Sequence, residues 1–321
     1  MKILGVNLSH NLSVCLLEDG KIKSFKHEER FCKHKNMRAE IGTTNNFITM
    51  NEHINSDLDL IAYNTVDYSQ EINPSELVQD VHKKFKHYKF FHDKKKHHLY
   101  HAFTGFYFSP FKEAMVIVVD GGGARPTSWP FQEIESIMYV NKRSYIEYFK
   151  HCSNMPDLPV EHNVFHYSDE ETIRTINGIQ YLFSSNSPGG IAFNKGSELM
   201  GFVYGEAGKL MGLSSYHYTK EKFNLNYDHV RLAAKIQEEN YKRTCKLIKQ
   251  AISYKGIKNI ILSGGVALNC VNNFKYVQTF KDVNFFIDPV PHDAGTAIGV
   301  ALYCHDYKWF KENYWLFIKT E

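Results

Sequence analysis

Three histidines occur within five residues in the stretch HHLYH, at positions 97 to 101. The stretch leads into the apolar segment AFTGFYF, which predicts a helix that enters the core. On a helix, His97 and His101 lie four residues apart and project from one face, whereas His98 points away from it. Such a pair predicts a metal site, but the preceding lysine run leaves a basic surface stretch as the alternative.

Two aspartates stand where a carboxylate could bind a cation. Asp120 ends the apolar strand AMVIVVD and precedes three glycines, whose backbone N–H groups can approach a phosphate closely. The alternative there is an ordinary hairpin turn. Asp293 follows PVPH at the start of a predicted helix, so it is either a metal ligand or the N-cap of that helix.

Two glycine-rich stretches are candidates for nucleotide binding. In LSGGVALN (262–269) a strand, Gly264-Gly265 and a helix follow one another, and a helix N-terminus suits an anion. A tight turn without a ligand is the alternative. GEAGKLMGLSSY (205–216) holds Glu206 and Lys209 between glycines, a pattern that is also typical of a solvated turn.

Length and composition indicate a soluble protein with a large core. The chain has 321 residues, 43% of them hydrophobic, which favours two compact lobes over one. Lys+Arg 38 against Asp+Glu 35 is nearly balanced, so net charge alone predicts no polyanionic partner. Six scattered cysteines without a C-x-x-C spacing indicate reduced thiols, and no signal peptide or membrane-spanning run is recognised. We therefore expect a cytoplasmic location.

Strands that alternate with helices in two halves predict an α/β architecture. KILGVNLSH, LSVCLLEDG and KIKSFKHEE read as three strands, with a hairpin turn at Asp19-Gly20, and a second set of strands opens at AMVIVVDGGG. A long helix is expected from Asp228, as its N-cap, to Gly256, whereas residues 153–200 are expected to be loops. This weak repeat predicts two lobes, residues 1–113 and 114–321.

The ordered series VNLSHNLSVCLLEDG, EERFCKHK, HHLYHA, VIVVDGGG, GEAGKLMGLSSY, LSGGVALNC and DPVPHDAGTAIGVAL resembles the O-carbamoyltransferases of the nodulation-factor, cephalosporin and aminoglycoside type. The resemblance runs from about residue 3 to about residue 303. It implies an actin-like, Hsp70-like (ASKHA) fold of two RNase H-like lobes that enclose a nucleotide. It also implies transfer of a carbamoyl group from carbamoyl phosphate, through ATP and carbamoyl-adenylate, to an acceptor hydroxyl.

The resemblance assigns roles that the residues alone leave open. It places His97, His101, Asp120 and Asp293 around a divalent metal, usually iron, although this ligand set does not by itself exclude manganese or zinc. It places His10 and Lys35 at the transfer centre, where they would act on the acceptor proton and on developing charge. The nucleotide side would be formed by Gly121, Gly122, Gly205, Glu206, Lys209, Gly264, Gly265 and Asn269.

Three questions about function stay open at this point. The family's second domain, which makes carbamoyl-adenylate, is not expected within the chain, so either a separate protein supplies this donor or the chain makes it. The stretch HKKFKHYKFFHDKKKHH (82–98) mixes lysines with aromatic residues and suggests a DNA or nucleotide acceptor, unless it is a solvated helix face. A sugar or other small-molecule acceptor, a tRNA threonylcarbamoyl-transferase-like subunit and a non-catalytic nucleotide-binding scaffold are the alternatives.

Overall fold

The structure is a computed structural model of the 321-residue chain. It describes residues 1–39, 47–66, 74–85, 89–125, 131–154, 171–184, 189–202, 206–218 and 226–306. Among these residues, no helix combines the length and the apolar character needed to cross a bilayer. The six cysteines are free thiols.

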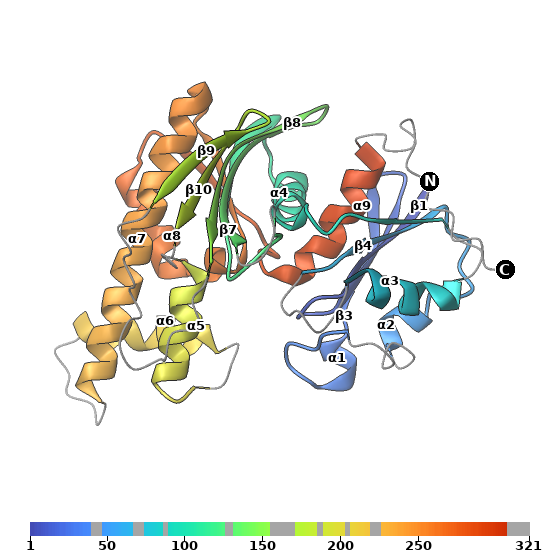
Figure 1. The fold of residues 1–321 in the computed structure, drawn as a ribbon, viewed down its shortest axis with the longest axis horizontal. Helices are drawn as coiled ribbons and strands as arrows, with labels where there is room; N and C mark the ends of the chain where they lie inside the picture. Colours follow the sequence, from blue (N-terminus) through green and yellow to red (C-terminus); the bar gives the residue numbers. More distant parts are fainter. Residues whose placement is uncertain are drawn as a thin grey trace.

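The first lobe is built on a mixed sheet of five strands in the order β3-β2-β1-β4-β5 (Figure 1). The first three strands form an antiparallel meander, and β4 and β5 run parallel to β1. The predicted Asp19-Gly20 turn joins β2 to β3, with left-handed φ values of 49° and 74° that suit a type I′ hairpin. The strands are β1 (Lys2–Asn7), β2 (Ser13–Glu18), β3 (Lys21–His27), β4 (Leu60–Asn64) and β5 (Phe90–His92).

Short helices accompany the first sheet. A core of Leu4, Val6, Ile61 and Tyr63 from the strands packs with Phe85 and other apolar side chains of these helical segments. The buried carboxylate of Glu28 accepts hydrogen bonds from the backbone N–H groups that begin α2. The segments are α1 (Glu29–Cys32), α2 (Ile48–Asn51), α3 (Pro74–His82) and η2 (Lys83–Phe85).

The second lobe repeats the topology of the first. Its seven-stranded sheet has the order β12-β11-β6-β7-β8-β10-β9, so that β8-β7-β6-β11-β12 reproduces the order 3-2-1-4-5 and β10 and β9 extend one edge. This repeat confirms the predicted duplication of RNase H-like lobes. The strands are β6 (Glu113–Val119), β7 (Gln132–Asn141), β8 (Tyr145–Ser153), β9 (Thr172–Ile176), β10 (Ile179–Ser184), β11 (Asn259–Ser263) and β12 (Asn284–Ile287).

The prediction of loops throughout residues 153–200 was wrong in part. The β9–β10 hairpin turns at Asn177-Gly178, where both residues have positive φ, and a helix follows from Gly190. An Asn-Gly pair between two apolar runs is a strong hairpin signal, so this element was recoverable from the sequence. Residues 155–170 and 185–188 lie outside the described residues.

The helices of the second lobe cover its sheet on the side away from the first lobe and extend below it (Figure 1). The long α7 begins two positions earlier than predicted, because Asn226 rather than Asp228 caps it by accepting from two backbone N–H groups. It ends, as expected, at Gly256. The elements are α5 (Gly190–Leu199), α6 (Ala207–Ser214), η3 (Ser215–Tyr218), α7 (Tyr227–Lys255), η4 (Gly265–Leu268) and α8 (Cys270–Thr279).

Two helices lie between the sheets, α4 (His97–Phe108) and α9 (Thr296–Asp306), the latter preceded by η5 (Asp293–Gly295) (Figure 1). They cross closely, since a Cβ on Gly299 would lie 1.9 Å from the Tyr100 carbonyl oxygen. A division of the chain after residue 113 separates the two sheets, but α9 packs on β1, β2 and β4. The first lobe therefore also includes this helix from the far end of the chain, which carries Asp293 to α4.

Candidate metal centre and its pocket

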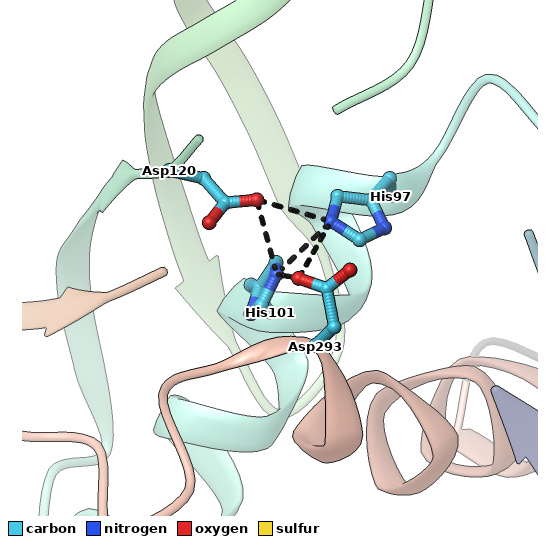
Figure 2. A group of neighbouring side chains, drawn as sticks. All are labelled: His97, His101, Asp120 and Asp293. Carbon is cyan, nitrogen blue, oxygen red and sulfur yellow. Dashed lines mark hydrogen bonds and ion pairs between the residues drawn. The ribbon is translucent and has the colours of Figure 1, made fainter. Parts of the chain in front are cut away.

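Two histidines and two aspartates converge between the lobes (Figure 2). His97 and His101 come from the first two turns of α4, Asp120 follows β6, and Asp293 opens η5. One ligand atom of each residue lies within 4.8 Å of the others, and all four side chains are buried. The helix spacing thus places both histidines on one face, and the fold brings two distant carboxylates to them.

The spacing of the ligand atoms suits a single metal ion. The two histidine Nε2 atoms are 3.1 Å apart, and His97 Nε2 is 3.3 Å from Asp120 Oδ2. Asp293 Oδ1 lies 3.6 Å from each Nε2 atom. A first-row metal bound at about 2.1 Å places neighbouring ligand atoms roughly 3.0–3.4 Å apart. Two imidazoles and two carboxylates are donors that such borderline metals accept.

The electrostatics of the cluster favour a bound cation. Burial lowers the pKa of His97, but Asp293 and Asp120 outweigh it and raise this pKa to about 10. Burial raises the pKa of both aspartates, yet the facing histidines hold each pKa below its usual value. The carboxylates are therefore ionised in a buried site, where positive charge between them and the imidazoles is strongly stabilised.

Neighbouring groups fix the orientation of the ligands. Asp293 Oδ2 accepts a hydrogen bond of 2.9 Å from Ser9 Oγ, and Asp120 Oδ1 accepts one of 3.1 Å from the backbone N–H of Gly265. Contacts of this kind orient metal ligands and raise metal affinity.

His98 belongs to a different group of side chains. Its Nδ1 lies 2.8 Å from Ser136 Oγ and 3.5 Å from Glu133 Oε1, both on β7. Burial lowers the pKa of His98 to about 4, so the ring is neutral there. The helix geometry expected from the sequence, with His98 turned away from the ligand pair, is what the structure shows.

A pocket of about 680 Å³ opens beside the metal centre and reaches both lobes. Asp120 forms part of its wall, so the candidate metal site and the pocket are continuous. The remaining predicted site residues that line it are His10, Lys35, Gly121, Gly122, Glu206, Lys209 and Gly265. His10 Nδ1 is 3.3 Å from Asp293 Oδ2, and Lys209 Nζ is 2.6 Å from Glu206 Oε1. The pocket thus collects residues from distant parts of the chain, from His10 to His292.

Two other predicted nucleotide residues, Gly264 and Asn269, do not line the pocket. Gly264 packs behind the pocket with a φ of 84°, and a Cβ there would lie 2.4 Å from the Val119 carbonyl oxygen. The Asn269 side chain caps α8 and exchanges hydrogen bonds with Gln237 instead of lining the pocket. Gly205 lies outside the described residues. Gly264 therefore acts through backbone conformation.

The sequence analysis missed several pocket residues. Phe193, Asn194 and Lys195 on α5, together with Gln132 and His292, also line the pocket. Gly190 opens α5 against the turn after Asp120, since a Cβ there would lie 2.6 Å from the Gly121 backbone nitrogen. The signal was Gly189-Gly190 before an apolar helix, the same kind of junction as Gly264-Gly265.

The lysine-rich stretch 82–98 does not lie at the pocket as the nucleic-acid hypothesis expected. None of its described residues lines the pocket, and β5 is the edge strand of the first sheet. Phe85 and Phe91 are 0% and 3% exposed and belong to the core, so they are not available to stack on bases. For Phe85 and Phe91 the expectation of exposed rings was wrong, because both pack in the core; Phe90 is half-buried and Tyr88 lies outside the described residues.

Comparisons with known proteins find one matching family and several distant relatives. Residues 224–302 match the family described as Carbamoyltransferase N-terminus. The chain is 25% identical over 225 residues to Nodulation protein NolNO of Sinorhizobium fredii. The aligned region covers 64% of this chain and 30% of that protein. It is 25% identical over 321 residues to an uncharacterized protein of Methanocaldococcus jannaschii, with coverage of 94% and 56%. The chain thus spans about a third to just over half the length of these relatives.

Solved structures share the fold at low sequence identity. Full-length HypF, in the phosphate- and nucleotide-bound form, superposes with a TM-score of 0.59 at 14% identity, covering 98% of this chain and 56% of that one. The activator of 2-hydroxyisocaproyl-CoA dehydratase from Clostridium difficile, with bound ADPNP, gives 0.51 at 12% identity and 95% coverage of both chains. The chain has the actin-like ASKHA fold that the sequence predicted.

Proposed function

Because the chain carries a carbamoyltransferase N-terminal domain and is a distant homologue of the nodulation proteins NolO and NolNO, we propose that it transfers a carbamoyl group from carbamoyl-adenylate to an acceptor hydroxyl. The observation that carries the proposal is the continuity of the buried His97–His101–Asp120–Asp293 cluster with a pocket that His10 and Lys35 also line. The pocket volume lies within the range of small-molecule sites.

His10 is the general base in this proposal. A carboxylate only accepts hydrogen bonds, so a neutral His10 beside Asp293 Oδ2 carries its proton on Nδ1 and keeps a lone pair on Nε2. Nε2 removes the acceptor hydroxyl proton as the oxygen attacks the carbamoyl carbon, AMP leaves, and a carbamate ester forms. Lys35 offsets the negative charge that develops on the transferred group or the leaving phosphate.

His97, His101, Asp120 and Asp293 would hold a divalent metal, which when bound supplies Lewis-acid polarisation of the donor. Iron is our choice, as the family resemblance implies, and manganese or zinc would suit the same ligands. Elemental analysis of the purified protein distinguishes the three. The residues themselves fix the position of this charge next to the pocket wall.

The nucleotide part of the donor would lie against the second lobe. Gly121, Gly122 and Gly265 bring backbone close to the pocket, as phosphate binding requires. Met211 and Leu268 supply apolar surface for a base. The donor reaches this site either from a separate carbamoyl-adenylate-forming protein or from ATP and carbamoyl phosphate on the same chain.

A small hydroxyl compound, such as a sugar, is the acceptor that we propose. The DNA or nucleotide alternative depended on the stretch 82–98, whose buried Phe85 and Phe91 serve the core. Lys94 and Lys95 are exposed but lie outside the pocket wall. Binding to hydroxymethylated DNA that weakens on charge reversal at these lysines would restore the alternative.

The proposal is tested by mass spectrometry of acceptor mixtures. Pools of sugars and other hydroxyl compounds are incubated with the protein and either carbamoyl-adenylate or ATP plus carbamoyl phosphate. We expect one compound to gain the mass of a carbamoyl group with the first donor. Activity with the second donor as well would show that this chain makes carbamoyl-adenylate. If no nucleophile releases AMP from carbamoyl-adenylate in the presence of the protein, the proposal is overturned.

A further inference from the structure

A second histidine lines the pocket, next in sequence to Asp293, whose carboxylate faces His10. His292 directly precedes Asp293 and lines the pocket, yet the proposed reaction gives it no role. Its ring packs edge-to-face on His27, with centroids 5.3 Å apart and an interplanar angle of 73°. Ser13 Oγ donates a hydrogen bond of 2.8 Å to the Ala294 carbonyl oxygen and anchors the turn that carries it. The imidazole therefore has a fixed position.

The hydrogen bonds of His292 define which ring nitrogen carries its proton. The backbone N–H of Ala294 points at His292 Nδ1 over 3.3 Å, as an N-cap contact for η5. A backbone N–H can only donate, so Nδ1 is the unprotonated acceptor and the ring proton is on Nε2. His292 thus offers a neutral N–H donor.

His10 has the opposite arrangement. Its Nδ1 faces Asp293 Oδ2 at 3.3 Å, which leaves the lone pair on Nε2. Two imidazoles therefore line the same pocket in complementary forms, one able to accept a proton and the other able to donate a hydrogen bond. Carbamoyl transfer needs both, because a proton leaves the acceptor while negative charge develops on the carbamoyl oxygen.

We propose that His292 Nε2–H donates a hydrogen bond to the carbamoyl carbonyl oxygen and stabilises the charge that forms there during transfer. This inference rests on the proposed carbamoyltransferase function. As the acceptor oxygen attacks the carbamoyl carbon, the π electron pair of the carbonyl moves onto the carbonyl oxygen, and it returns when AMP leaves. The acceptor proton goes to His10. The His292 proton stays on His292 throughout.

A purely structural role for His292 is separable from this one by substitution. His292→Asn keeps a side-chain oxygen that can accept from Ala294 N–H but removes the Nε2–H donor. His292→Gln places an amide N–H close to the reach of Nε2, whereas His292→Ala removes both contacts. His305→Asn, at the far end of α9, is the matched control because its ring packs on Gly20 and pairs with Asp306, outside the pocket wall.

The assay uses freshly prepared carbamoyl-adenylate with hydroxylamine as a nucleophile in place of the acceptor, and measures hydroxyurea and AMP. We expect His292→Asn to keep the melting temperature and the KM for carbamoyl-adenylate while kcat falls by about 10²–10³-fold, the usual effect of losing one oxyanion donor. His292→Gln should recover part of kcat. The control should match the parent protein.

Nitrogen-15 NMR of histidine-labelled protein tests the same assignment without activity. We expect the His292 ring to show the proton on Nε2, and a proton on Nδ1 would overturn the inference. A His292→Asn variant with the parent kcat would also overturn it while leaving the proposed function intact. A parent protein that transfers no carbamoyl group to hydroxylamine would overturn the proposed function and this inference together.

Discussion

Two of the buried groups in which histidines meet carboxylates are built differently. In the candidate metal centre, two aspartates face two imidazoles across the boundary of the lobes. In the second lobe, Glu135 on β7 faces His151 on β8 and Arg243 on α7. The first group borders the pocket described above through Asp120, whereas no residue of the second group lines that pocket.

In the Glu135 group, neighbouring side chains balance the charge of the carboxylate and pair with its oxygen atoms. Arg243 Nε lies 3.0 and 2.9 Å from the two Glu135 oxygens, and His151 Nδ1 lies 2.8 Å from Oε2. The other ring nitrogen of His151 is 2.7 Å from Ser184 Oγ. Burial raises the pKa of Glu135, but Arg243 and His151 outweigh it and lower the pKa to about 2. Its partners are complete within the protein.

This contrast separates a structural ion network from a candidate site. Ser184, His151 and Glu135 have the connectivity of a hydrolase triad, yet they are 2%, 2% and 0% exposed and none of them lines the pocket. In the metal centre, by contrast, the ligand atoms face one point, and Asp120 forms part of the pocket wall. Convergence together with access distinguishes the two, because residue types alone do not.

The largest expected effect comes from removing one metal ligand. His101→Ala should abolish metal binding and reduce carbamoyl transfer by more than about 10²-fold, since even supporting residues around a metal commonly cost 10–100-fold. The fold should persist, because the cluster is held by three separate segments, α4, the turn after β6 and η5. Elemental analysis and the hydroxylamine assay measure the two quantities.

His151→Ala is the matched comparison, another buried histidine paired with a carboxylate. It should leave the metal content unchanged and lower the free energy of unfolding instead. A His101→Ala protein with the parent metal content would remove the distinction between the two groups.

Only part of this site could be predicted from local sequence. The i, i+4 spacing places His97 and His101 on one face, but no spacing rule joins them to Asp293, which α9 returns from the end of the described chain. The family resemblance supplied that link. The residue pattern also gave a wrong prediction at Phe85 and Phe91. Aromatic residues among lysines suggested an exposed face, but tertiary packing buries both rings. The hairpin turn at Asn177-Gly178 could have been predicted from the Asn-Gly pair but was not.

The next effect concerns stability alone. Arg243→Ala leaves the Glu135 carboxylate buried with its main cationic partner gone, and breaking a buried pair in this way costs about 3–5 kcal/mol. Arg243 is itself partly exposed, with a side-chain exposure of 24%, so we expect the lower end of that range. Denaturant unfolding measures it, and metal content is the control. A loss of metal in this variant would show that the two groups are coupled.

The smallest effect is a pH dependence that belongs to the closed group. Glu135 has a folded-state pKa of about 2, below its usual value of 4.5. A carboxylate whose pKa is lower in the folded than in the unfolded state stabilises the folded state at pH values above its unfolded-state pKa. This contribution is lost as the pH falls from about 4.5 toward 2. The slope is at most about 1.4 kcal/mol per pH unit. In Glu135→Gln this titration is absent, so the difference in unfolding free energy between the parent and the variant should be constant from pH 7 to 5 and shrink below it. Urea unfolding at pH 7, 5, 4 and 3.5 tests this directly. A difference that stays constant to pH 3.5 would mean that Arg243 and His151 do not favour the ionised form of Glu135, and the closed network would then be only a matter of packing.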